Sequence, residues 1–239
     1  MRTTFHEELD HISDQLVEMT RIPGSAIARA TPALLDADLH LAEDVITGDR
    51  TLDQARESLD VLAVDVLARQ QPVATDLRVV VTALRMSADL ERMGDLARHV
   101  AKVARLRYPQ SAVPAPMRSL ILEMGQVAER IVAKAGSVIA ARDVDMAGSL
   151  EKEDDAMDAL HRRVFTVLHG STLPAETIVD LTLLGRYYER FADHAVSVAR
   201  RVVYLVTGEH HTEATVDHDF PDVTGSSVRS LRSALDAGR

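Results

Sequence analysis

The 239-residue chain contains no cysteine and no tryptophan, and aromatic residues make up only 3% of it. The lack of cysteine excludes disulfides, thiolate metal sites and a cysteine nucleophile. So few aromatic side chains are unusual for sandwiches and barrels, whose strands are rich in aromatic and β-branched residues. The apolar residues are instead mostly Ala, Val and Leu, which suit helices. These absences favour an all-α protein.

Long hydrophobic runs are missing as well. No stretch approaches the roughly 18 consecutive apolar residues that a membrane-spanning helix needs. Residues 1–16 also lack the apolar core of a signal peptide. We therefore expect a cytoplasmic protein that does not insert into a membrane and meets one only through a partner.

Positive charge is in short supply, since the formal net charge is −10. A chain this acidic repels phosphates, so nucleic acid is not expected as a partner. The charge fits a cationic partner, such as a metal ion or a basic protein surface. The alternative is that acidity only keeps the protein in solution.

Apolar residues recur at spacings of three and four along most of the chain, which predicts six long helices. The first is expected to kink at Pro23-Gly24, and the second to begin at the capping residue Asp38. The expected ends are Gln70 for the second helix and Arg107 for the third. The last three helices are predicted to cover 117–141, 143–169 and 175–207.

The second half of the chain repeats the plan of the first. Motifs of the second helix recur 105 positions later, and motifs of the third helix recur 98 positions later. A shorter second hairpin accounts for the difference. This repeat predicts two tandem, pseudo-symmetric three-helix bundles. The predicted divisions are a first bundle at 1–107, a Pro-rich linker at 108–116, a second bundle at 117–208 and a mostly disordered tail at 209–239.

Four motifs of the same form place two acids four residues apart, twice in each half. These acids are Asp49 and Asp53, Glu91 and Asp95, Asp154 and Asp158, and Glu189 and Asp193. Side chains at this spacing share a helix face about 5–6 Å apart, where like charges repel. The helical rise brings the two motifs of each half to the same level. Each bundle is therefore expected to present a patch of four carboxylates that a cation would stabilise.

All-oxygen ligands favour hard cations such as Mg²⁺, Mn²⁺, Ca²⁺ or iron, and carboxylates from separate helices can bridge several ions. The alternative is a solvated acidic face paired with bases such as Arg92 and Arg190. Weaker candidate ligands are His99, His161 in the Asp158-x-x-His161 pair, and His194. No glycine-rich phosphate loop, serine nucleophile motif or zinc signature is present, so catalysis is not expected.

Two of the repeated segments resemble the signature helices of a known family. LERMGDLARHVAKVA at 90–104 and YERFADHAVSVARRV at 188–202 are similar to those of the PhoU family. The Asp49–Asp53 motif followed by LARQQPVATDLR resembles the first hairpin of that family. The resemblance covers about residues 3–208, and the segment from Leu181 to Glu209 further resembles the actinobacterial branch.

The resemblance implies a non-enzymatic negative regulator of phosphate uptake and of the phosphate-starvation response. Such proteins connect the phosphate-specific ABC transporter to a membrane histidine kinase and are often homodimers. Their acidic motifs bind metal ions, at times as multinuclear clusters. Carried over by position, the metal ligands here would be Asp49, Asp53, Glu91, Asp95, Asp154, Asp158, Glu189 and Asp193.

The chain departs from the family pattern at three positions near these acids. Leu96 stands where a histidine is common, and His99 and Ser197 stand where an asparagine is common. Two other functions remain open on the residues alone. A carboxylate-bridged di-iron enzyme would want two Glu-x-x-His motifs, of which only Asp158-x-x-His161 comes close. The other is a helical scaffold that binds no metal.

Overall fold

The computed structural model describes residues 2–209, with side chains from residue 5 onward. Nearly all of this part is helical and none of it is strand, which confirms the all-α class. The predicted tail at 209–239 lies outside the described residues except for Glu209. The elements are α1 (Arg2–Asp36), α2 (Leu39–Gly48), α3 (Arg50–Gln70), α4 (Ala74–Arg107), the short 3₁₀ helix η1 (Ala115–Met117), α5 (Arg118–Ala141), α6 (Val144–Leu168) and α7 (Ala175–Thr207).

The second predicted helix is divided into α2 and α3, with Asp49 between them. The backbone of Asp49 keeps helical angles, φ −56° and ψ −34°, so the chain continues in nearly the same direction. Its carbonyl accepts hydrogen bonds from the amides of Leu52, at 3.0 Å, and Asp53, at 3.4 Å. A tighter turn therefore follows Gly48, whose lack of a side chain weakens the helix there.

Equivalent aspartates begin the corresponding helix in each half. Asp38 Oδ1 accepts a hydrogen bond of 3.0 Å from the Leu41 amide at the start of α2. Asp143 Oδ1 accepts one of 2.9 Å from the Met146 amide at the start of α6. Gly208 ends α7 with a left-handed φ of 78°. These caps confirm the starts near residues 38 and 143 and the end at Gly208 that the sequence predicts.

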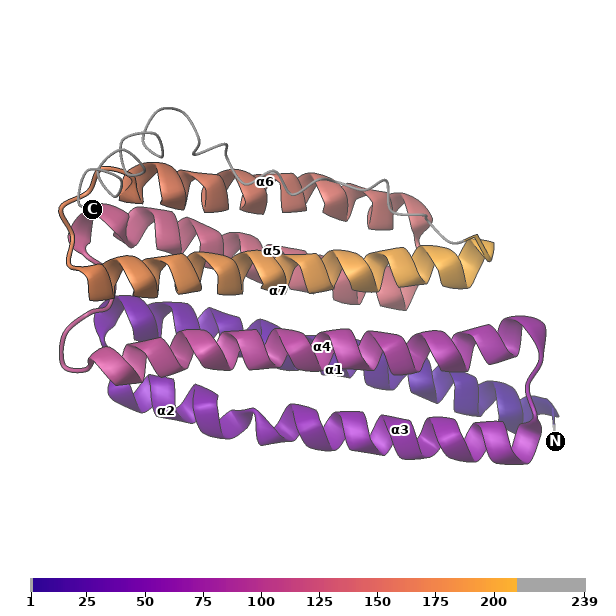
Figure 1. The fold of residues 1–239 in the computed structure, drawn as a ribbon. Coiled ribbons are helices and arrows are strands. Elements are labelled where there is room, and N and C mark those ends of the chain that lie inside the picture. The colour runs from indigo at the N-terminus through magenta and orange to yellow at the C-terminus, as the bar shows by residue number, and fades with distance from the viewer. Residues whose placement is uncertain (1, 210–239) are drawn as a thin grey trace, which may run out of the picture.

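The helices form two three-helix bundles that lie side by side (Figure 1). One contains α1, the α2–α3 pair and α4, and the other contains α5, α6 and α7. The bundles meet where α1 packs on α5 and α4 packs on α7. Buried Ala, Val, Leu, Ile and Met side chains form one continuous core through both bundles.

Small residues allow α1 and α5 to approach closely. A Cβ atom added to Gly125 would lie 2.6 Å from both γ atoms of Thr31. One added to Gly136 would lie 2.6 Å from Thr20 Oγ1. Thr31 is itself fixed, because its hydroxyl is 2.9 Å from the buried hydroxyl of Tyr188 on α7. This interface therefore holds the two bundles in one arrangement.

Helices α4 and α7 run antiparallel through the middle of the molecule (Figure 1). Asp89 of α4 bonds Arg201 near the end of α7, whereas Arg107 at the end of α4 bonds Asp180 near the start of α7. Between them, the rings of His99 and Tyr187 lie 5.3 Å apart. None of the described helices combines the length and hydropathy that spanning a bilayer requires.

Candidate functional site

Four of the predicted acids gather where α3 begins beside the middle of α4. This N-terminal cluster consists of Asp49, Asp53, Glu91 and Asp95. Gly94 permits the close approach, because a Cβ there would overlap Leu52 and lie 3.5 Å from Asp49 Oδ1. Burial raises the pKa of Asp49, and the charges of the other three acids raise it further against the opposing effect of Arg98. The structure therefore brings these four carboxylates into one electrostatic environment.

Arginine side chains bridge the carboxylates of the N-terminal cluster. Arg98 Nη1 lies 3.0 Å from Asp49 Oδ2, and its other terminal nitrogen donates to Asp95. Arg92 Nη1 donates to Asp95 Oδ2 over 3.0 Å, and Arg92 Nε lies 3.7 Å from Glu91 Oε2. Both arginines thus contact two acids each, as a metal ion would.

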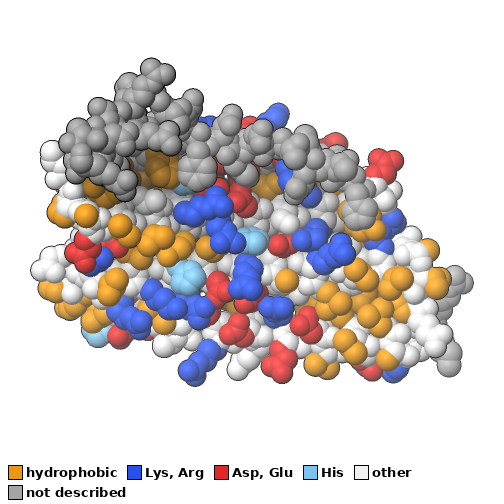
Figure 2. Space-filling view, in the orientation of Figure 1, with side chains coloured by type: hydrophobic (Ala, Val, Ile, Leu, Met, Phe, Trp, Pro, Cys, Tyr) orange, Lys and Arg blue, Asp and Glu red, His pale blue; other side chains and the backbone are white. Residues whose placement is uncertain are grey.

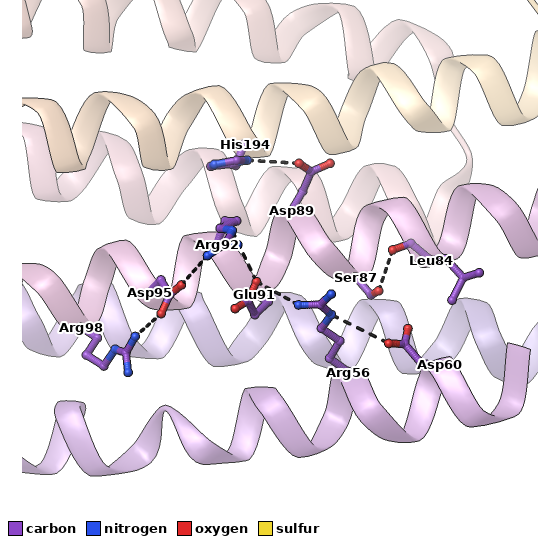
Figure 3. Close-up of polar contacts among 10 residues, drawn as sticks. All are labelled: Arg56, Asp60, Leu84, Ser87, Asp89, Glu91, Arg92, Asp95, Arg98 and His194. Carbon is purple, nitrogen blue, oxygen red and sulfur yellow. Dashed lines mark hydrogen bonds and ion pairs between the residues drawn. The ribbon is translucent and has the colours of Figure 1, made fainter.

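A third arginine enters the cluster from α3. Arg56 lies 3.1 Å from Glu91 Oε2 and 4.0 Å from Asp60 Oδ2. Figure 3 shows the resulting line of alternating charges along α4 and α3. Its members are Arg98, Asp95, Arg92, Glu91, Arg56 and Asp60.

The other four predicted acids gather between α6 and α7. This C-terminal cluster consists of Asp154, Asp158, Glu189 and Asp193. Burial raises the pKa of Asp154 to about 7, and the negative charges of Asp193, Asp158 and Glu189 add to the effect. Glu189 is only 2% exposed, and burial followed by the charge of Asp193 raises its pKa to about 7 as well. Both carboxylates are thus placed where a negative charge is poorly stabilised.

Three buried polar atoms in and beside the C-terminal cluster lack hydrogen-bond partners among the described residues. They are Asp154 Oδ1, Glu189 Oε2 and His161 Nε2. Arg186 pairs with the other oxygen of Glu189, and Arg162 approaches Asp158 Oδ2 only to 3.9 Å. Because buried carboxylate oxygens need a donor or a cation, these atoms are suited to a metal ion.

In neither cluster do the carboxylates converge on a single position that an ion could occupy. In the part of the chain that the structure describes, no three His, Asp or Glu side chains converge closely enough to hold an ion as they stand. Mutual repulsion of four carboxylates favours such spreading. The ligand chemistry of the C-terminal cluster fits a hard cation, and guanidinium groups already neutralise much of the N-terminal cluster.

The three histidines considered as weaker ligands have different surroundings. His194 Nδ1 lies 3.1 Å from Asp89 Oδ1, across the interface between the bundles. Burial and the charge of Lys102 lower the pKa of His99, whose ring contacts Tyr187. His161, whose pKa is lowered by burial and Arg186 against the opposing charge of Asp158, stands beside the C-terminal cluster. The neutral form is therefore favoured, as metal ligation requires.

Asp89 was not predicted as a functional residue. It is 9% exposed and accepts hydrogen bonds from Ser197 Oγ at 3.1 Å and Arg201 Nε at 2.7 Å. The sequence signal is weak, being one acid within the mostly apolar segment from Val79 to Leu90. Figure 2 shows acidic side chains interspersed among basic ones across the middle of the face on which α4 and α7 meet.

These features define a class: a duplicated three-helix-bundle fold with one acidic cluster in each half. A family model described as the PhoU domain matches residues 16–104 and again 121–202. The chain belongs to the PhoU family.

Relatives and solved structures agree with this assignment. The phosphate-specific transport system accessory protein PhoU homolog 2 of Mycobacterium tuberculosis is 48% identical over 214 residues, covering 87% of this chain and 99% of that protein. PhoU homolog 1 of Mycobacterium leprae is 46% identical over 222 residues, covering 90% and 98%. These relatives place the chain in the actinobacterial branch. The crystal structure of PhoU from Pseudomonas aeruginosa matches with a TM-score of 0.76 at 29% identity, over 86% of this chain and 100% of that one.

Proposed function

We propose that this protein is a negative regulator of phosphate uptake and of the phosphate-starvation response. It acts as a metal-binding adaptor between the phosphate-specific ABC transporter and a sensor histidine kinase, and it catalyses no reaction. The observation that supports this most strongly is the pair of acidic clusters at equivalent places in a PhoU-family fold. The names of the mycobacterial relatives, which describe phosphate-transport accessory proteins, support the same role.

The proposed metal ions are Mg²⁺, Mn²⁺ or iron, which prefer carboxylate oxygens. Asp154 Oδ1 and Glu189 Oε2, which have no hydrogen-bond partner within residues 5–209, support a cation at the C-terminal cluster. When bound, the ion would neutralise the acids and join α6 to α7. The chain's own contribution is to hold these acids at fixed positions on two long helices.

Deletion of the gene tests the regulatory role. In phosphate-rich medium, we expect a reporter of phosphate-uptake genes to be active in the deletion strain and silent in the parent. Reintroduction of the wild-type gene restores silence. Normal repression in a deletion strain that carries no paralogue would contradict the proposal.

The adaptor role predicts where the protein is found in cells. We expect a homodimer in the cytoplasmic fraction, which appears with membranes only when the transporter or the kinase is present. Fractionation of strains lacking one or both membrane proteins checks this, together with light scattering of the purified protein. Equal membrane association in the strain that lacks both would contradict an adaptor.

A further inference from the structure

The two acidic clusters differ in the residues that surround them at equivalent positions. Arg56 of the first half corresponds to His161, 105 positions later. Arg98 corresponds to Val196, 98 positions later. The acids are thus repeated, whereas two of the bases that neutralise them are not.

In the N-terminal cluster, the arginines occupy the place of a bridging cation. Arg98 joins Asp49, at the junction of α2 and α3, to Asp95 of α4, and Arg56 joins α3 to Glu91 of α4. A guanidinium group carries a permanent charge and presents several donors in a plane, which suits contact with two carboxylates. The side chain of Asp49 is only 10% exposed, so the pair with Arg98 is largely withdrawn from water. A metal ion entering here would have to displace these contacts.

In the C-terminal cluster, Arg186 pairs with Glu189 Oε1, but the positions equivalent to Arg56 and Arg98 supply no such charge. Val196 is apolar and 3% exposed, and the Nε2 atom of His161 has no hydrogen-bond partner among the described residues. The side chain of Glu189 is 3% exposed, and its Oε2 atom is likewise without a hydrogen bond. By contrast, Glu91 Oε2, which also lacks a hydrogen bond, lies 3.1 Å from Arg56.

We infer that the two clusters take different cations: the guanidinium groups of Arg56 and Arg98 fill the N-terminal cluster, and divalent metal ions bind only at the C-terminal cluster. This rests on the proposed metal-binding function and narrows it to one half of the molecule. It also replaces the expectation of two equivalent sites with eight ligands. The N-terminal cluster then joins α3 to α4 at any metal concentration, and the C-terminal cluster alone responds to metal.

The repeat provides a matched pair of variants, Asp53→Asn and Asp158→Asn, which alter equivalent positions. Mn²⁺ binding to the full-length protein is measured by equilibrium dialysis with elemental analysis. We expect Asp158→Asn to weaken Mn²⁺ binding by about tenfold or more. Asp53→Asn should leave both the affinity and the number of bound ions as in wild type. Equal weakening by both variants would overturn the inference while leaving the metal-binding function standing.

Exchanging the residues at these positions between the halves tests whether the arginines are what excludes metal from the N-terminal cluster. The double variant Arg56→His/Arg98→Val gives the N-terminal cluster the residues of the second half, and it should bind additional Mn²⁺. His161→Arg gives the C-terminal cluster the arginine that the first half has at the equivalent position, in addition to Arg186 and Arg162, and it should abolish Mn²⁺ binding. Far-ultraviolet circular dichroism confirms that each variant is folded, and the Asp53→Asn and Asp158→Asn pair decides the matter if one is not.

The outcomes separate the two proposals. If folded Arg56→His/Arg98→Val binds no more Mn²⁺ than wild type, the arginines are not what excludes metal and the inference is wrong. If wild type binds no Mn²⁺, Mg²⁺ or Fe²⁺ at all, the metal-binding function itself fails. Both the metal-binding function and the inference are supported if Asp158→Asn loses metal, Asp53→Asn keeps it and the double variant binds more.

Discussion

Asp89 on α4 accepts a hydrogen bond of 2.7 Å from Arg201 on α7, and this contact joins the two bundles. Ser197 donates to the same carboxylate oxygen over 3.1 Å, and His194 contacts the other oxygen. Burial alone would raise the pKa of Asp89, but the hydrogen bonds from His194 and Arg201 outweigh it and lower that pKa. The ionised form of Asp89 is therefore the one that the fold stabilises.

Asp89→Asn should lower the free energy of unfolding by on the order of 2–3 kcal/mol, because it leaves Arg201 without its ionic partner at a mostly buried interface. Urea denaturation at pH 7 measures the change. The control is Asp44→Asn, whose carboxylate pairs with Arg29 at side-chain exposures of 68% and 44%. That variant should change stability by no more than about 0.5 kcal/mol. Equal losses in the two variants would show that the contact between Asp89 and Arg201 contributes no more to stability than an exposed ion pair does.

The same carboxylate predicts a dependence on pH. A lowered pKa in the folded state means that the stabilisation is present above the ordinary value of 3.8. It is lost as the pH falls below that value through the folded pKa, where the native carboxylate takes up a proton. The stability difference between wild type and Asp89→Asn should therefore be full at pH 5 and smaller at pH 3. A difference that stays constant over this range would assign the effect to packing.

Glycines at the α1–α5 interface give a test of close packing. Gly125→Ala should destabilise the protein by about 1–3 kcal/mol, because the added methyl group meets Thr31, which is fixed by its contact with Tyr188. Gly148→Ala on α6 is the matched control, since no atom of the part of the chain that the structure describes lies within 4 Å of its added Cβ. That variant should stabilise the helix by roughly 0.5–1 kcal/mol. Melting temperatures that change in the same direction for both variants would contradict the close approach of α1 and α5.

Helix-forming patterns are local, and the sequence therefore predicted them well. The capping role of Asp38, the end at Gly208 and the repeated acids depend on neighbours within one turn or on an internal repeat. The break at Asp49 was not predicted, because the flanking residues keep helical spacing and the backbone stays nearly helical there.

The sequence predicted that the acidic motifs of each half meet, but it did not reveal which bases pair with them across distant segments. Arg98 reaches Asp49 from 49 positions away, and Arg201 reaches Asp89 from 112. The pairing of each acid with a particular base depends on how the helices are rotated and on the register of α4 against α3 and α7. The internal repeat does show that Arg98 corresponds to Val196. Its consequence for metal binding becomes visible only in the structure, where Arg98 contacts both Asp49 and Asp95.

The C-terminal cluster predicts how stability changes with pH when metal is removed by a chelator. The pKa of Asp154 is raised to about 7 in the folded state, against an ordinary value of 3.8. Below the ordinary value both states are protonated, so the group has no effect on stability. As the pH rises towards 7, the unfolded state releases its proton first, and the native state becomes less stable. Asp154→Asn removes this loss, so the variant should be the more stable protein at pH 8, by on the order of 2 kcal/mol.

Adding metal should reverse that order. A divalent ion that binds only the folded form raises stability by about 2–3 kcal/mol at a hundredfold excess over Kd. Because the ligands must be ionised, the rise for wild type should be larger at pH 8 than at pH 5. Asp154→Asn has lost a ligand, so its melting temperature should respond less to Mn²⁺ while exceeding that of wild type in chelator. The carboxylates would be an ordinary polar surface if two results were found together. The wild-type melting temperature would not change with Mn²⁺ or Mg²⁺, and Asp154→Asn would be no more stable than wild type in chelator.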